Sequence, residues 1–223
     1  WGVDPLTIDR ARLALALAVL KGTQRRAAQH SCFGMHEWAM VYRTSPSDVR
    51  HESESLRLSP TEISGVVDDV GLRCTHIDAF RFFTAKAEPL NEYTPTRARQ
   101  ANDEQPGCIH ANMDLYKYAM WFQPYIPGNL VVDCFELSVY AREIDMRASP
   151  YDLKHLGYSP IAVETIDGRR EYASAQRDIA AKADSLRQSL ITGLTAVDTA
   201  ASASTRHPMT NRDATPIAAT SAG

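Results

Sequence analysis

The chain contains no run of uncharged apolar residues long enough to cross a membrane. A membrane-spanning helix needs about 20 such residues, whereas the longest run among the 223 residues, Leu13 to Leu20, has eight. It follows Asp9, Arg10 and Arg12, which favours a core helix over a secretion signal. We therefore expect a soluble, cytoplasmic protein with no membrane partner.

Paired cysteines are also absent. The four cysteines, at positions 32, 74, 108 and 134, are widely spaced, and none forms the CxxC pair typical of structural zinc sites and redox couples. A chain of this size does not depend on disulfides for stability. We expect four reduced thiols.

Several catalytic and binding signatures are missing. The glycines are isolated, so the sequence contains no phosphate-binding loop, and no serine lies in a G-x-S-x-G elbow. His36-Glu37 lacks the second histidine of an H-E-x-x-H zinc motif. With 24 basic and 27 acidic residues, a formal charge of -3 and a pI near 6.2, the chain has no general attraction for nucleic acid.

The pattern of apolar residues predicts an α+β fold: one helix-rich domain over residues 1–195 with a small sheet. A disordered tail is expected over 196–223, because Ala, Ser and Thr bury too little surface there to offset the entropy of ordering. The expected helices cover 5–21, 60–67, 109–122, 130–144 and 172–194, the expected strands 72–79 and 161–166, and the expected long loop 88–107.

Two predictions within these elements concern the direction of side chains. In the strand over 72–79, His76 and Asp78 would project to the same side, because side chains alternate along a strand. In the helix over 130–144, the apolar residues Val132, Phe135 and Val139 are expected to face the core, with Tyr140 beside them.

Three short segments combine histidine and carboxylate with large apolar side chains. They are His36 to Arg43, Thr75 to Phe83 and His110 to Tyr116. Buried polar groups need partners that offset their lost hydration. Three such segments in one domain indicate a reaction site, provided that the fold brings them together.

The carboxylates Glu37 and Asp78 have two interpretations. Burial beside aromatic residues would raise the pKa of either group and suit it to acid or base catalysis. Alternatively, Glu37 pairs with Arg43, and Asp78 with Arg81, as structural ion pairs. His110 and Asp114, four residues apart on one helix, form either a catalytic pair, in which the acid orients the imidazole, or a surface pair.

The histidines also have two interpretations. His76 and Asp78, together with the distant His110, could form a two-histidine, one-carboxylate face for iron or a related ion. The alternative is that His36 and His76 are core residues with hydrogen-bonded ring nitrogens. Among the aromatic residues, Trp38, Tyr116 and Trp121 belong either to the core or to a pocket for a flat heterocycle.

Four strings of residues resemble a group of actinobacterial proteins labelled 3-methyladenine DNA glycosylase. They are Cys32 to Arg43, His76 to Thr84, Glu104 to Lys117, and Asp145 to Leu153, and the likeness spans roughly residues 30–175. The group's members extend further at the N-terminus, so Trp1 is expected to mark a shortened version. The chain lacks the helix-hairpin-helix pattern and the basic excess that many glycosylases have.

The resemblance implies hydrolysis of the N-glycosidic bond of an alkylated purine in damaged DNA, with no metal. A carboxylate would activate water and stabilise the oxocarbenium-like transition state, and aromatic faces would stack on the extruded base. The expected catalytic residues are Asp78, Glu37, Asp114, His76 and His110, and the expected binding residues are His36, Trp38, Arg81, Tyr116 and Trp121.

Two other functions remain open. The first is a metal-dependent enzyme that acts on a small molecule, with His76, Asp78 and His110 as ligands. The second is a non-catalytic binding protein in which the polar segments are satisfied core networks. The sequence itself does not identify a cofactor, and a stoichiometric metal ion would exclude the metal-free glycosylase.

Overall fold

The computed structural model describes residues 4–45, 49 and 53–206, and all the regular secondary structure in these ranges is helical. The helices are α1 (Arg10–Gln24), α2 (Met35–Ala39), α3 (Pro60–Val70), α4 (Ile77–Phe80), α5 (Gln100–Asp103), α6 (Ile109–Trp121), α7 (Gly128–Ala148) and α8 (Ile166–Arg206). Short 3-10 turns cover Pro5–Thr7, Glu88–Leu90, Arg97–Arg99 and Lys154–Leu156. The prediction of an α+β fold is wrong: the described residues form an all-α protein.

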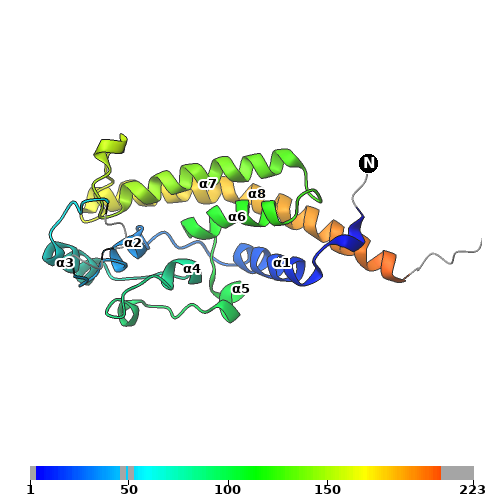
Figure 1. The fold of residues 1–223 in the computed structure, drawn as a ribbon, viewed down its shortest axis with the longest axis horizontal. Coiled ribbons are helices and arrows are strands. Elements are labelled where there is room, and N and C mark those ends of the chain that lie inside the picture. Colours follow the sequence, from blue (N-terminus) through cyan, green and yellow to red (C-terminus); the bar gives the residue numbers. More distant parts are fainter. Residues whose placement is uncertain (1–3, 46–48, 50–52, 207–223) are drawn as a thin grey trace, which may run out of the picture.

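The helices α7 and α8 run side by side in opposite directions along the long axis, and α6 packs against both (Figure 1). The helix α1 packs along the later part of α8 and also against α5, whereas α2 to α4 and their connecting loops lie toward the other end of the molecule. Short connections between consecutive antiparallel helices are typical of helix bundles. The long helices therefore form a scaffold, and the shorter helices and loops cover one side of it.

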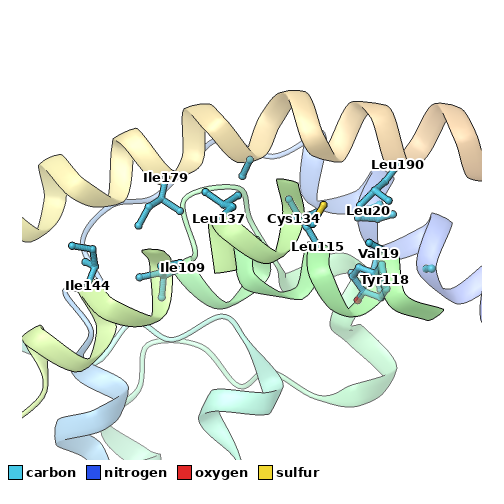
Figure 2. Close-up of a cluster of buried hydrophobic side chains, with 14 of the residues drawn as sticks. Val19, Leu20, Ile109, Leu115, Tyr118, Cys134, Leu137, Ile144, Ile179 and Leu190 are labelled. Atoms are coloured by element: carbon cyan, nitrogen blue, oxygen red, sulfur yellow. The ribbon is translucent and has the colours of Figure 1, made fainter. Parts of the chain in front are cut away.

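The core lies where α1, α6, α7 and α8 meet (Figure 2). It contains, among others, Val19, Leu20, Ile109, Leu115, Cys134, Leu137, Ile179 and Leu190, each at most 5% exposed. Full burial of one such aliphatic side chain contributes roughly 1.5–3 kcal/mol. This core holds α6 and α7 in register, and both helices carry side chains of the site described below.

The predicted strand over 72–79 is not formed. Leu72 makes an isolated bridge to Asn91, and the chain enters α4 at Ile77. The side chain of Asn91 replaces a partner strand, since its Oδ1 accepts from the Cys74 N–H (2.7 Å) and its Nδ2 donates to the Cys74 carbonyl (2.9 Å). The backbone polar groups are thus satisfied without a sheet.

The second predicted strand, over 161–166, is also not formed: residues 161–165 are irregular, and α8 begins at Ile166. Gly168 lies in the first turn of α8, where a side chain would meet the Ala162 carbonyl oxygen at 1.9 Å. The glycine therefore permits a close backbone contact. The first helix, expected to end at residue 21, continues to Gln24 and includes Gly22.

The predicted inward face of α7 is also wrong. Val132, Phe135 and Val139 are 53%, 48% and 53% exposed. The buried face carries Leu130, Cys134, Leu137, Ala141, Ile144 and Asp145. Both stripes have helical spacing, but the small side chains of Cys134 and Ala141 allow neighbouring helices a close approach, which bulky valines and phenylalanine prevent.

The helix α8 continues to Arg206, so the first part of the predicted tail is helical and the rest lies outside the described residues. Alanine has the highest helix propensity, and Arg10 of α1 binds Asp198 (3.2 Å) and the Ser202 hydroxyl (3.0 Å). Ala201 is buried. Throughout the described ranges, no helix has the length and apolar character required to traverse a bilayer.

Replacing Gly22 by Ala should destabilise the protein by about 1–3 kcal/mol, because the new methyl group would overlap backbone atoms that cannot move aside. Its position lies 2.1 Å from the Ala101 carbonyl oxygen. Gly65→Ala is the matched control, since nothing lies within 4 Å of its Cβ position in α3, and it should stabilise by about 0.5–1 kcal/mol. Urea unfolding measures both changes, and equal effects would contradict the predicted close packing.

Candidate metal centre

Three histidines from distant parts of the chain lie next to one another. His36 is in α2, His76 precedes the first turn of α4, and His110 is in the first turn of α6. The ring centroids of His36 and His110 are 4.4 Å apart and nearly perpendicular, and those of His76 and His110 are 5.5 Å apart. The structure thus brings together the three polar segments noted in the sequence.

The short helix α2 is fixed to the end of α7. The indole N–H of Trp38 donates to the Ala148 carbonyl at 2.9 Å, and this tryptophan is fully buried. Gly34 immediately precedes the helix, and its positive φ of 68° is readily adopted by glycine. These contacts direct His36 and Glu37 toward Asp145 and Arg142 of α7.

We define the first ligand set as His36, His110 and Asp145, whose nitrogen and carboxylate oxygen atoms lie within 4.8 Å of one another. The Nε2 atom of His36 is 3.3 Å from Asp145 Oδ1, and that of His110 is 3.9 Å from Asp145 Oδ2. Two atoms bound to one ion at about 2.1 Å in tetrahedral geometry lie about 3.4 Å apart. The spacing therefore fits ligands that share one ion.

Two atoms of this set lack a hydrogen-bond partner within the described part of the chain: His36 Nε2 and Asp145 Oδ1. Both are buried, and they face each other without the geometry of a hydrogen bond. Buried polar atoms are nearly always satisfied, and an orphaned pair calls for an unseen water or ion. An ion between them would satisfy both.

Glu37 and Arg142 border the first ligand set. The Arg142 Nη1 atom donates to Glu37 Oε1 at 3.2 Å and to Asp145 Oδ2 at 2.8 Å. Glu37 Oε1 is also 3.6 Å from His36 Nε2. The arginine therefore offsets part of the charge of two buried carboxylates, and Glu37 lies close enough to act on a group bound at the ion.

We define the second ligand set as His76, Glu104 and Asp114. His76 Nε2 is 3.2 Å from Glu104 Oε1 and 3.3 Å from Asp114 Oδ2. On the outer side, Lys117 forms a close ion pair with Asp114. The two sets are neighbours because His110 and Asp114 lie one turn apart on α6.

The electrostatic environment separates the histidines. Burial alone would lower the pKa of His36, but the carboxylates of Asp145 and Glu37 outweigh it and raise the pKa to about 10. Burial, with the positive charge of His36, lowers the pKa of His110 to about 3. Without a metal, His36 is therefore an imidazolium at neutral pH and His110 is neutral.

The carboxylates respond in opposite ways. Burial opposes ionisation of Asp114, but His76 and Lys117 lower its pKa to about 2. Burial likewise opposes ionisation of Asp145, yet His36 and other nearby cations hold its pKa well below the ordinary value. For Glu104, burial prevails and raises the pKa. The charges of Asp114 and Asp145 are thus stabilised by cations beside them, whereas the charge of Glu104 is incompletely compensated.

Two hollows lie beside Arg142 and Met146. One, of about 180 Å³, has Glu37 and Leu153 in its wall, and the other, of about 470 Å³, has Met113 and Tyr116. Arg142 and Met146 line both. A small molecule with an apolar body and an anionic group fits this combination of side chains.

The structure places several predicted site residues away from the histidines. Asp78 is paired with Arg97, and more loosely with Arg81 at 3.6 Å. Trp38 is enclosed in the core, whereas Trp121 is partly exposed near Lys117 and Arg12. The alternative of a structural ion pair therefore describes Asp78. Glu37 pairs with Arg142 in place of Arg43, which binds Asp68.

Sequence reasoning did not select Asp145, Glu104 or Arg142 as site residues. Asp145 had a detectable signal, because it continues the apolar stripe of Leu137 and Ala141 and is therefore an acid on a core face. Glu104 had no such signal in the sequence, since it lies in an irregular segment whose position depends on tertiary contacts. Arg142 could be recognised only after Asp145, because it lies three residues before it on the same helix.

Comparisons with known proteins do not identify relatives. No family model matches the chain, and neither the curated proteins nor the solved structures contain a match. The interpretation of the site therefore depends on its geometry and chemistry.

Nuclear magnetic resonance titration of the metal-free protein should find His36 protonated up to about pH 10 and His110 neutral down to about pH 3. Because folding raises the pKa of His36, its protonation stabilises the fold fully below pH 6.5, and this contribution is lost as the pH rises toward 10. Asp145→Asn should lower the pKa of His36. A common midpoint near 6.5 for both rings would contradict the described electrostatics.

Proposed function

We propose that this protein is a divalent-metal-dependent hydrolase whose ion is held by His36, His110 and Asp145. The observation that carries the proposal is the pair of buried, unsatisfied atoms, His36 Nε2 and Asp145 Oδ1, at 3.3 Å beside His110. Two imidazoles and one carboxylate suit zinc, iron(II) or manganese(II), and leave positions open for water and substrate.

The residues around the ion supply the remaining requirements of hydrolysis. An ion held by His36, His110 and Asp145 would act as a Lewis acid and lower the pKa of a bound water. Glu37, whose Oε1 atom is 3.6 Å from His36 Nε2, would accept the proton that this water loses when it attacks the substrate, and would pass it to the leaving group as that bond breaks. Arg142 would stabilise the negative charge that develops.

The preferred substrate is a small molecule with an anionic group. Arg142 lines both hollows, and Met113, Tyr116 and Met146 provide apolar surface beside it. A guanidinium group binds carboxylate or phosphate in a planar, bidentate manner. We also place the enzyme in the cytoplasm, a proposal supported by four free cysteines, which are typical of a reducing compartment.

An N-glycosidic bond is a second candidate for the bond that is cleaved. The resemblance to proteins labelled 3-methyladenine DNA glycosylase motivates it, and Tyr116 in the larger hollow, whose ring packs at a tilt against that of Phe135 with the centroids 5.2 Å apart, offers an aromatic wall. Release of 3-methyladenine from alkylated DNA, assayed with and without added metal, tests this candidate. Release that is unaffected by chelation would favour the metal-free mechanism instead.

Addition of Zn²⁺, Mn²⁺ or Fe²⁺ to the metal-free protein should raise its unfolding temperature. At a free ion concentration 100 times Kd, binding stabilises the native state by about 2.7 kcal/mol. Asp145→Asn should abolish most of this gain, because a carboxylate ligand is lost. Asp133→Asn is the matched control, an exposed aspartate on the same helix, and it should retain the full gain. Absence of any shift in the unaltered protein would refute the proposal.

Glu37→Gln should retain the metal but lower the rate of hydrolysis about 10²–10⁴-fold, the usual contribution of a general base. The amide can still accept the hydrogen bond from Arg142, so the fold should persist. Steady-state kinetics on the first substrate found by screening esters, amides and phosphoesters gives the comparison. Unchanged turnover with bound metal would exclude Glu37 as the base.

A further inference from the structure

The second ligand set lies immediately beside the first. Its three side chains come from separate elements: His76 precedes α4, Glu104 follows α5 and Asp114 is in α6. The distances from His76 Nε2 to the two carboxylate oxygens are 3.2 and 3.3 Å. These values again match two oxygens and one nitrogen around a common ion.

Glu104 is the residue that most requires a cation. It is 1% exposed, and its hydrogen-bond donor is the neutral amide of Gln100 at 2.7 Å. Among the described residues, His76 is the partner that lies within ion-pair distance of Glu104. His76 is also within ion-pair distance of Asp114, and a buried carboxylate that shares its one cationic partner with a second carboxylate is incompletely compensated. A divalent ion at His76 Nε2 would supply the missing charge.

His110 connects the two sets. Its ring stands between those of His36 and His76, at centroid distances of 4.4 and 5.5 Å. Asp114 follows one helical turn after His110 on α6, so one face of this helix contributes to both sets. Two ions held in this way would be close neighbours, as in the two-metal centres of hydrolases.

The formal charges of the buried groups accommodate a second ion together with bound anions. Of the four carboxylates, Glu37 and Asp145 lie against Arg142 and Asp114 lies against Lys117, whereas Glu104 lies against His76. One divalent ion together with Arg142 and Lys117 balances the four negative charges. Two divalent ions with these two cations carry six positive charges against four negative ones. The difference of two suits a hydroxide ion together with an anionic group of the substrate, in agreement with the position of Arg142.

Lys117 supports the competing interpretation, a simple ion-pair network around Asp114. Its ammonium group contacts Asp114, and the side chain is 30% exposed. This partial exposure allows the lysine to move toward solvent when an ion binds. In the ion-pair network, by contrast, Lys117 would pair with Asp114 permanently, and Asp114 and Glu104 would share the single charge of a protonated His76.

We propose that His76, Glu104 and Asp114 bind a second divalent metal ion, so that the centre contains two ions. This inference rests on the proposed function for the first ion. The second ion would orient an anionic substrate and stabilise its leaving group, while the first ion activates water.

Metal analysis and calorimetry on the full chain, freed of metal and then titrated with Mn²⁺, test the proposal. The expected stoichiometry is two ions per chain. Glu104→Gln should bind one ion. Asp103→Asn, a carboxylate on the preceding residue that pairs with Arg99, is the matched control and should keep two ions.

Lys117→Met provides a test in the opposite direction. Removing the competing ammonium group should tighten the weaker binding step by about tenfold.

One ion per chain in the unaltered protein, unaffected by Glu104→Gln, would overturn the second site and leave the first intact. No bound ion at all would overturn both proposals. Circular dichroism of each variant establishes that a lost ion does not reflect unfolding.

Discussion

The burial of carboxylates among helices constrains this part of the molecule more than any other interaction. Asp145 is fully buried, and Glu37 and Glu104 are 5% and 1% exposed. The effective cost of removing each such ion from water is several kcal/mol unless a cation and hydrogen bonds compensate for it. Arg142, Lys117 and the histidines therefore have to lie where they do, and the packing of α2, α6 and α7 holds them there.

The segment that carries Glu104 is held by side chains rather than by secondary structure. The Gln105 amide accepts from the backbone N–H groups of Gln29 (2.8 Å) and Gly107 (2.7 Å). Asn112 donates to the Pro106 carbonyl and accepts from Arg187, which is fully buried. Buried polar networks of this kind rigidify a core, although Nε and Nη1 of Arg187 have no hydrogen-bond partner among the described residues. They place Glu104 beside His76 although the surrounding chain is irregular.

The sequence predicted the existence of the long helices better than their ends. The helix α6 lies close to the expected 109–122, and a capping box formed by Ser59 and Glu62 marks the expected start of α3. In contrast, α1 continues past Gly22, and α8 extends beyond the expected 172–194 at both ends. The predicted strands failed because alternation over a few residues does not show whether a partner strand exists. Asn91 took that role with its side chain.

For the site, local composition identified the three histidines, because each lies with a carboxylate among large apolar residues. It also favoured Asp78, which is bound to Arg97 in the structure, because sequence adjacency to His76 resembled a ligand motif. The true neighbours of His76 are Glu104 and Asp114, which are distant along the chain. Pairing across such distances depends on tertiary packing, and a single sequence carries little information about it.

The same carboxylates that suit a metal ion also hold a proton in its absence. His36 retains its proton with a pKa of about 10 because Asp145 and Glu37 face it. Displacing such a proton at pH 7 costs about 4 kcal/mol, which an incoming ion must overcome through its own bonds. In the proposed centre, a proton and a metal ion would therefore compete for one position between His36 and Asp145. The proton on His36 stabilises the buried Asp145 and Glu37 in the chain without an ion.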